Sequence, residues 1–209
     1  MTLDDIKHIY GEIKDYEFND YVAVIGGEPT INPNILEILD FLDKQKFKIK
    51  SGKLLLVTNG LNDPVIRKVL ERRYRQIYVD FYDNSISEKY ASIYGTDNIV
   101  KRRRTAKNSN RSDMHLNFLY GEKDDCHLPF FKCKVFNRCG KGVFKLHGKV
   151  WYYHNTACKS LCILLGKEHL FKQHFKDLFD DVAGMYSLNS ELCPYCVLAR
   201  RKQIYWKDD

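Results

Sequence analysis

The sequence has no cysteine before Cys126, although seven cysteines follow between Cys126 and Cys196. It also has no apolar run of about 18 residues, so no membrane-spanning helix is expected. The acidic start, Met1–Asp5, lacks the apolar core of a signal peptide. These absences predict a cytoplasmic protein. In a reducing compartment, thiols that cluster in one part of a chain indicate metal binding rather than disulfides.

The charge is not balanced, because the 209 residues carry a formal net charge of +7. Part of the excess lies in Lys101–Arg104, Lys107 and Arg111, and part lies in Arg200–Lys202. Such stretches permit nucleic-acid binding, but a solvated helix face is the favoured interpretation. An acidic peptide or a phosphorylated substrate would also suit a basic surface. The 44% hydrophobic content predicts a folded chain, with one domain or one domain and a small appendage.

Strands and helices alternate over the first 120 residues. The patterns predict strands at 21–25, 53–58, 76–81 and 114–119. They also predict a helix at 2–14, a second from Pro33 with Asn32 as its cap, and a third from Asp63-Pro64. A fourth helix is expected from Ser85, which forms a capping box with Glu88. Because the strands are continuously apolar and their connections are short, we expect a parallel sheet with crossover helices. The predicted fold class is α/β, with a partial (β/α) barrel.

The pattern changes near residue 121, which divides the chain into a barrel-like domain at 1–120 and a cysteine-rich module at 121–209. Two strands, 143–146 and 149–153, flank His147-Gly148 and predict a β-hairpin. A helix is expected from Gly166 to Asp181, followed by the pair Cys193-Pro194-Tyr195-Cys196. The module is therefore predicted as a hairpin plus a helix.

Polar clusters end three of the predicted strands. Gly26-Gly27-Glu28-Pro29 follows the first strand, Thr58-Asn59-Gly60 ends the second, and the segment from Asp80 to Asp83 ends the third. In parallel sheets, ligands bind beyond the carboxyl ends of the strands. Glycine lets the backbone approach a ligand closely, and a carboxylate there can hold a ligand amine. The sequence thus predicts a binding rim at this edge.

Four thiols form the clearest metal set: Cys139, Cys158, Cys193 and Cys196. Thiolates select zinc or iron–sulfur clusters, and the spacing does not choose between them. Buried free thiols would explain Cys126 or Cys162 but explain a C-x-x-C pair with two further thiols poorly. A glutaredoxin-type dithiol would need a thioredoxin-like fold after it, and only 13 residues follow Cys196. Cys126, Cys133 and Cys162 stay unassigned.

The sequence resembles the radical S-adenosylmethionine (SAM) enzymes that have a twitch or SPASM-like auxiliary module. The resemblance rests on Gly-Gly-Glu-Pro before an Asn-Pro helix start, on Thr-Asn-Gly at the next strand end, and on the cysteine-bearing hairpin. The resemblance implies that Gly26, Gly27 and Glu28 bind the methionine amino group of SAM. Pro29 would shape the turn, Thr58 and Asn59 would line the rim, and Asp80 or a neighbour would contact the ribose. Cys139, Cys158, Cys193 and Cys196 would hold an auxiliary 4Fe–4S cluster.

The activity that this resemblance implies is reductive cleavage of SAM to a 5′-deoxyadenosyl radical, which acts on a peptide or small-molecule substrate. The sequence departs from the family because it has no C-x-x-x-C-x-x-C loop for the active cluster. We expect a fragment of a longer protein, a split-enzyme subunit whose partner chain supplies the loop, or a decayed relative, and we favour the first. The alternative function is a non-catalytic metal-binding scaffold that contacts nucleic acid or an acidic partner.

Overall fold

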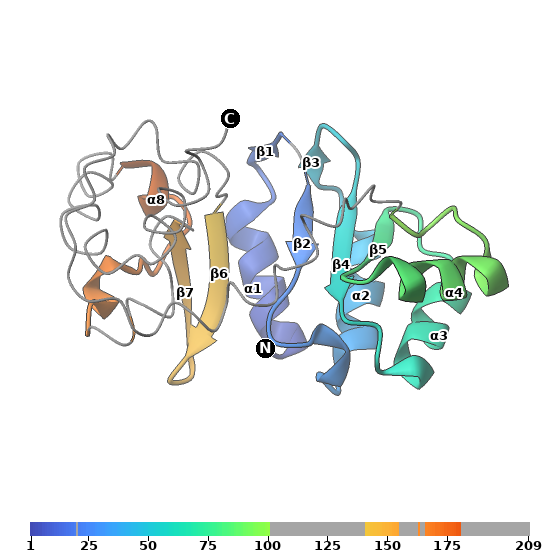
Figure 1. Cartoon of the computed structure of the whole chain (residues 1–209). Coiled ribbons are helices and arrows are strands. Elements are labelled where there is room, and N and C mark those ends of the chain that lie inside the picture. The colour runs from blue at the N-terminus through green and yellow to red at the C-terminus, as the bar shows by residue number, and fades with distance from the viewer. Residues whose placement is uncertain (20, 101–140, 155–162, 164–165, 181–209) are drawn as a thin grey trace, which may run out of the picture. The chain divides into compact units, whose positions relative to one another are not determined.

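The computed structural model describes residues 1–19, 21–100, 141–154, 163 and 166–180 (Figure 1). The chain divides into two compact units, Met1–Ser109 and Asn110–Asp209. The domain boundary predicted near residue 120 stays a prediction. Within the described ranges, no helix combines the length and the apolar character needed to cross a membrane.

The first helix, α1 (Leu3–Ile13), is fixed at its start by a reciprocal cap. The Thr2 hydroxyl accepts from the Asp5 amide at 3.3 Å, and the Asp5 carboxylate accepts from the Thr2 amide at 2.6 Å. These two hydrogen bonds satisfy donors that the first helical turn leaves free. Ile9 and Ile13 are buried. The helix predicted at 2–14 is confirmed.

The central sheet of the first unit contains β2 (Val22–Val24), β4 (Leu54–Thr58) and β5 (Ile77–Phe81). All neighbours are parallel, in the order β2-β4-β5. Helix α2 (Ile35–Lys44) connects β2 to β4, and α3 (Asp63–Glu71) connects β4 to β5. The α/β class with parallel strands is confirmed. The described strands form an open sheet and no closed barrel, and the partial barrel itself is not confirmed.

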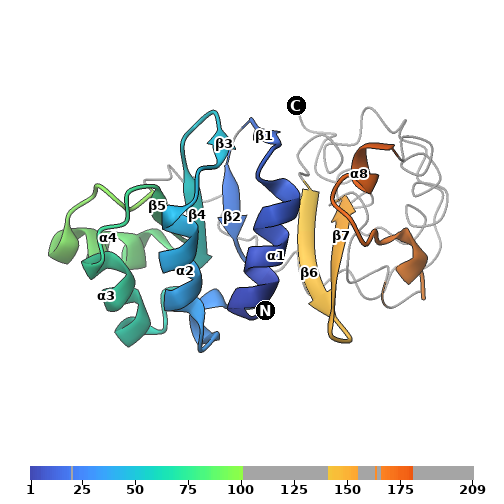
Figure 2. The same ribbon diagram turned by 180° about the vertical axis from the view of Figure 1, so that it is seen from behind.

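Helices α1, α2 and α3 lie together on one face of this sheet (Figure 2). The buried cluster on that face comprises Ile35, Ile38, Leu39, Leu42, Leu54, Leu56, Ile66, Val69, Leu70, Tyr74, Ile77, Val79, Phe81, Tyr90 and Ile99. After β5, helix α4 (Asn84–Tyr94) packs its Tyr90 ring on Phe81, with ring centroids 5.2 Å apart. Past Gly95 the chain returns beside β5, where Ile99 pairs with Val79 in parallel.

Two predicted helix starts are wrong in detail. Helix α2 begins at Ile35, with Asn34 at its N-cap position and no side-chain capping hydrogen bond, and a short 3-10 helix, η1 (Pro29–Ile31), precedes it. Asn32 accepts from the Asn34 amide at 3.0 Å and so shapes the turn before the helix. Helix α4 is capped by Asp83, which accepts from the Ser85 amide at 2.7 Å, and not by a Ser85–Glu88 capping box.

Two very short strands were not predicted. Strands β1 (Glu17–Phe18) and β3 (Lys48–Ile49) pair in parallel directly before β2 and β4. Two residues are too few to show a period-two pattern, and lysine is disfavoured in strands. The fourth strand predicted at 114–119 lies outside the described residues.

In the second unit, the hairpin is confirmed. Strands β6 (Lys141–Leu146) and β7 (Lys149–His154) pair antiparallel around His147 and Gly148. Both turn residues have positive φ, 49° and 78°. This is the backbone conformation of a two-residue type I′ turn, whose twist matches that of the strands.

The helix predicted from Gly166 to Asp181 is confirmed only at 177–180 and is wrong over the rest of its described part. Instead, η5 (Glu168–Leu170) and α8 (Asp177–Asp180) flank an extended segment in which Lys172 pairs with Tyr152 through two 2.8 Å backbone hydrogen bonds. Phe171 contacts Phe144 with ring centroids 4.8 Å apart, and Phe175 contacts Tyr152 at 5.8 Å. The apolar spacing therefore serves packing on the hairpin, which overrides helix formation.

Candidate functional site

The predicted rim is held together by one carboxylate. Glu28 follows β2, and its Oε1 atom accepts three hydrogen bonds: from the Thr30 amide at 3.0 Å, the Thr30 hydroxyl at 2.6 Å and the Thr58 hydroxyl at 2.7 Å. Its Oε2 atom accepts from the Asn59 amide at 2.8 Å. Thr58 and Asn59 stand at the end of β4. Glu28 therefore ties the loop after β2 to the loop after β4.

The same four donors stabilise the ionised carboxylate. Partial burial raises the pKa of Glu28, but hydrogen bonds from the Asn59 amide, the two threonine hydroxyls and the Thr30 amide outweigh it. The net result is a pKa below the ordinary value. Glu28 is thus a fixed anion at neutral pH, with an orientation set before any ligand binds.

Two residues that strengthen the rim were missed from the sequence. Thr30 is buried and provides two of the donors to Glu28. Asn62, which precedes α3, donates its side-chain amide to the Thr30 carbonyl at 2.7 Å. The signal for Thr30 is a hydroxyl two residues after a carboxylate at a helix start, where η1 uses Glu28 as its cap. No local signal exists for Asn62, because its partner lies 32 residues away.

The two glycines of the rim are not required by the fold. Gly26 and Gly27 are exposed, neither has a positive φ, and a Cβ atom at either would meet nothing within 4 Å. Gly60, at the end of the next strand, is different, because its φ is +73° and its Cβ would lie 2.5 Å from Ile86. Internal packing therefore explains Gly60 but leaves Gly26 and Gly27 for another explanation.

The other predicted rim residues lie at different depths. Pro29 is buried in η1, and the side chain of Asn59 accepts from the Leu61 amide at 2.9 Å, so that side chain shapes the turn. Asp80 is fully buried on β5, where it pairs with Val57 of β4. The next pair of the two strands is Thr58 with Phe81. The structure thus brings Glu28, Thr58 and Asn59 into contact and places Asp80 inside the sheet.

Four large apolar side chains are exposed along this edge. Ile25 follows β2, Tyr82 follows β5, and Ile31 and Leu61 lie on the two loops between these strands, with exposures of 73% and 76% for the last two. Ile31 and Leu61 flank the Asn62–Thr30 hydrogen bond, so their backbones are close. The Tyr82 amide donates to the Thr58 carbonyl at 3.1 Å, which joins the third loop to the rim. The charged centre thus has apolar neighbours.

The predicted metal ligands Cys139, Cys158, Cys193 and Cys196 lie outside the described residues, as do Cys126, Cys133 and Cys162. Among the residues that the structure does describe, no three His, Cys, Asp or Glu side chains are grouped so that they could hold a metal ion. The metal module stays a prediction from the sequence.

No protein-family model matches the chain, and neither the curated proteins nor the solved structures contain a match.

Proposed function

We propose that this chain is a radical SAM-type protein, or part of one, whose rim after β2 and β4 binds the methionyl end of SAM. The observation that carries the proposal is the Glu28 carboxylate, which four donors hold in place beside two exposed glycines. A carboxylate offers about four acceptor positions in total. Because Oε1 already accepts three hydrogen bonds, the remaining capacity for a ligand ammonium lies on Oε2.

The residues at the rim suit the chemistry of SAM. The ionised Glu28 suits the ammonium group, and the missing side chains at Gly26 and Gly27 leave the backbone accessible to a ligand. Ile31 and Leu61 offer exposed apolar surface for an adenine ring. These features support a SAM site, and the peptide or small-molecule substrate is a further part of the proposal.

Cleavage of SAM needs an active cluster, for which the 209 residues contain no C-x-x-x-C-x-x-C motif and no cysteine before Cys126. The rim of this chain does not fit that cluster by itself, so no cleavage step is assigned to it. We therefore expect the isolated chain to bind SAM without producing 5′-deoxyadenosine. Release of 5′-deoxyadenosine by the isolated chain under reducing, anaerobic conditions would contradict this assignment.

A matched pair of glycine substitutions tests the site. Gly27→Ala should leave the melting temperature nearly unchanged, because its Cβ meets no neighbour, but should weaken SAM binding measured by calorimetry at least tenfold. Gly11→Ala is the control: it lies on the exposed face of α1, should stabilise the helix by about 1 kcal/mol, and should leave SAM affinity unchanged. Equal SAM affinity in both variants would refute the rim as the binding site.

The four cysteines are proposed to bind an auxiliary 4Fe–4S cluster or, alternatively, zinc. Four thiols that include a C-x-x-C pair have the right chemistry for either. Iron, zinc and sulfide content after anaerobic reconstitution would distinguish the two. The double variant Cys193→Ala, Cys196→Ala should lose the metal, while SAM binding at the rim should persist. Metal binding with no SAM binding would favour the scaffold function instead.

A further inference from the structure

A basic surface lies at the opposite end of the sheet, where β4 and β5 begin. Two segments of the chain, 40–53 and 71–76, precede these strands and carry eight cations against three carboxylates. The cations are Lys44, Lys46, Lys48, Lys50, Lys53, Arg72, Arg73 and Arg75, and all are exposed. We call this set the amino-end basic surface. In the sequence, its residues are distinct from the basic stretches at 101–111 and 200–202.

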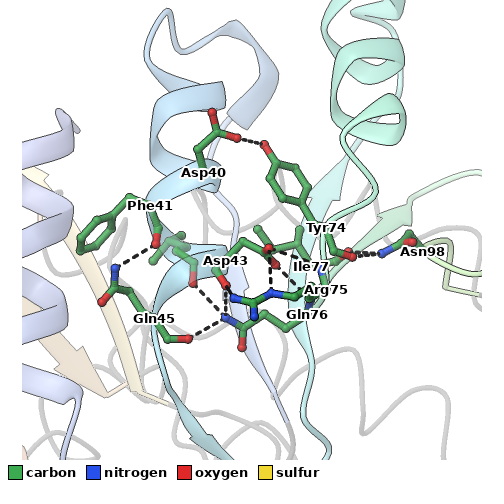
Figure 3. Close-up of polar contacts among 10 residues, drawn as sticks. Asp40, Phe41, Asp43, Gln45, Tyr74, Arg75, Gln76, Ile77 and Asn98 are labelled. Carbon is green, nitrogen blue, oxygen red and sulfur yellow. Dashed lines mark hydrogen bonds and ion pairs between the residues drawn. The ribbon is translucent and has the colours of Figure 1, made fainter.

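Hydrogen bonds hold the two segments side by side (Figure 3). The Gln76 side-chain amide donates to the carbonyls of Leu42, Asp43 and Gln45 at 3.0, 3.0 and 2.8 Å. The Asp43 carboxylate accepts from the amides of Arg75 and Gln76 at 3.3 and 3.0 Å. The end of α2 and the residues before β5 therefore form one hydrogen-bonded support, which holds together the two segments that carry the cations.

The carboxylates of these segments are largely occupied by this support. Asp40 accepts from the Tyr74 hydroxyl at 2.7 Å and from Arg72 at 3.0 Å, and Asp43 binds two backbone amides. Within the described part of the chain, five of the eight cations have no carboxylate partner: Lys44, Lys46, Lys48, Lys53 and Arg73. The surface therefore keeps most of its positive charge.

The lysines from Lys46 to Lys50 form a regular row. Exposed Lys46, Lys48 and Lys50 alternate with half-buried Phe47 and Ile49, which pack against the core. In an extended chain, residues two apart on one face are about 6.6 Å apart. Such a line of cations suits an extended backbone of regularly spaced phosphates, because single-strand binding surfaces follow the phosphate backbone.

An exposed aromatic side chain lies at the same edge. Tyr21 precedes β2 and is 53% exposed, and the next amide, that of Val22, donates to the Lys53 carbonyl at 3.4 Å. Lys53 lies over the Tyr78 ring at 5.0 Å. Bases of single-stranded nucleic acid stack on such rings beside cations. An acidic peptide has no base to stack. Stable membrane binding would need apolar side chains beside the cations, whereas the exposed aliphatic side chains Ile25, Ile31 and Leu61 lie at the other end of the sheet.

We propose that the amino-end basic surface binds single-stranded nucleic acid, with Lys46, Lys48 and Lys50 along the phosphates and Tyr21 stacked on a base. The proposal does not depend on SAM binding, since the two surfaces lie at opposite ends of the strands. One further carboxylate, outside the two segments, opposes it: Glu17 pairs with Lys50 at 3.6 Å, and both side chains are more than half exposed. Removal of that charge should strengthen binding.

The test is fluorescence anisotropy of the full chain with a labelled oligouridylate of about 12 nucleotides across a salt series. Lys46→Gln with Lys48→Gln should weaken binding and reduce the slope of log K against log salt by about 1.4, for two lost phosphate contacts. Tyr21→Ala should weaken binding roughly tenfold without changing that slope. Glu17→Gln should tighten binding. All three changes lie on exposed side chains, so thermal unfolding should report intact folding.

The matched control is Lys7→Gln with Lys68→Gln, which removes the same charge from exposed sites on α1 and α3. If both double variants reduce the slope equally, or neither does, the amino-end basic surface is not the binding site. That second result would place any binding on the stretches at 101–111 or 200–202. Equal competition by polyglutamate, binding to phosphatidylserine vesicles in place of the oligonucleotide, or an unchanged affinity for Tyr21→Ala would also overturn the proposal.

Discussion

Thr58 and Glu28 meet across the ends of two strands, with the Thr58 hydroxyl 2.7 Å from Glu28 Oε1. The same hydroxyl oxygen accepts from the Gly60 amide at 3.0 Å. Thr58 is fully buried, so its hydroxyl is shielded from water. One side chain therefore fixes the carboxylate of the rim and the glycine turn after β4 together.

Thr58→Val should test this double role, because valine has nearly the same shape but no hydroxyl. The Gly60 amide and one position on Glu28 would lose their partner, at a cost of about 1–3 kcal/mol. Urea unfolding should show the loss. The same change at Thr96, an exposed residue after α4, is the control and should alter stability little. Equal effects at the two sites would mean that the hydroxyl of Thr58 contributes nothing specific.

The pH dependence of stability should reveal Glu28. Its pKa in the folded chain is below the ordinary value of 4.5. A group with a depressed folded pKa stabilises the fold above its unfolded pKa, and that contribution is lost as the pH falls through the folded pKa. Glu28→Gln should therefore reduce the fall in unfolding free energy below about pH 4.5. An acid slope that is the same in Glu28→Gln and in the unchanged chain would contradict this prediction.

The sequence predicted the central strands and the hairpin because each has a local signature. Continuous apolar runs gave β2, β4 and β5, and His147-Gly148 between apolar segments gave the β6–β7 turn. The segment after Gly166 shows where such signatures fail. Phe171, Phe175 and Leu178 have a spacing that suits a helix. In the structure, Phe171 and Phe175 instead pack on the β6–β7 hairpin, and Leu178 is buried.

The candidate site could be predicted in outline but not in its contacts. Strand ends in a parallel sheet share one edge, so the sequence placed Glu28 and Thr58 on the same rim. It did not show that Glu28 would be held by four internal donors, because the Asn59 amide and Thr58 hydroxyl are 31 and 30 residues away. The lysine row was missed for a similar reason. Strand β3, which carries Lys48, forms by pairing with β1, and neither two-residue strand has a sequence pattern of its own.

Gln76 should be essential for the support beneath the basic surface. Its side-chain amide reaches three carbonyls at the end of α2, which a helix leaves without partners. Gln76→Glu keeps the shape but turns a donor into an acceptor that faces these carbonyls and lies beside Asp43. We expect a loss of more than about 2 kcal/mol in unfolding free energy. Gln173→Glu, at an exposed position in the second unit, should change stability little.

The turn of the hairpin offers a stabilising change. His147 has φ of +49°, a conformation that asparagine and glycine adopt more readily than histidine. His147→Asn should therefore stabilise the second unit by up to about 1 kcal/mol, measured by thermal unfolding. Gly148→Ala is the opposite test, because φ of +78° strains any side chain, and it should destabilise. A loss of stability in His147→Asn would show that the imidazole itself contributes to the fold.

Tyr90 and Asp63 should control stability at the two extremes of pH. The Tyr90 hydroxyl donates to Asp63 Oδ1 at 2.7 Å, and Asp63 also binds Arg67. Burial and this hydrogen bond raise the pKa of Tyr90 to about 12, while hydrogen bonds from Arg67 and Tyr90 lower the pKa of Asp63 to about 2. Because the pKa of Tyr90 is higher in the folded chain than in the unfolded chain, the neutral hydroxyl stabilises the fold at pH values below the unfolded pKa of about 10. This contribution to stability is lost as the pH rises towards 12.

Tyr90→Phe should therefore remove part of the alkaline loss of stability and raise the pKa of Asp63, so that acid unfolding begins at a higher pH than in the unchanged chain. Tyrosinate absorbance in a pH titration and the carboxyl shift of Asp63 measure the two effects separately. The Tyr90→Phe variant keeps the packing of the ring on Phe81. If the pH profile of stability does not change in this variant, the hydroxyl has no electrostatic role, and the ring alone joins α4 to β5.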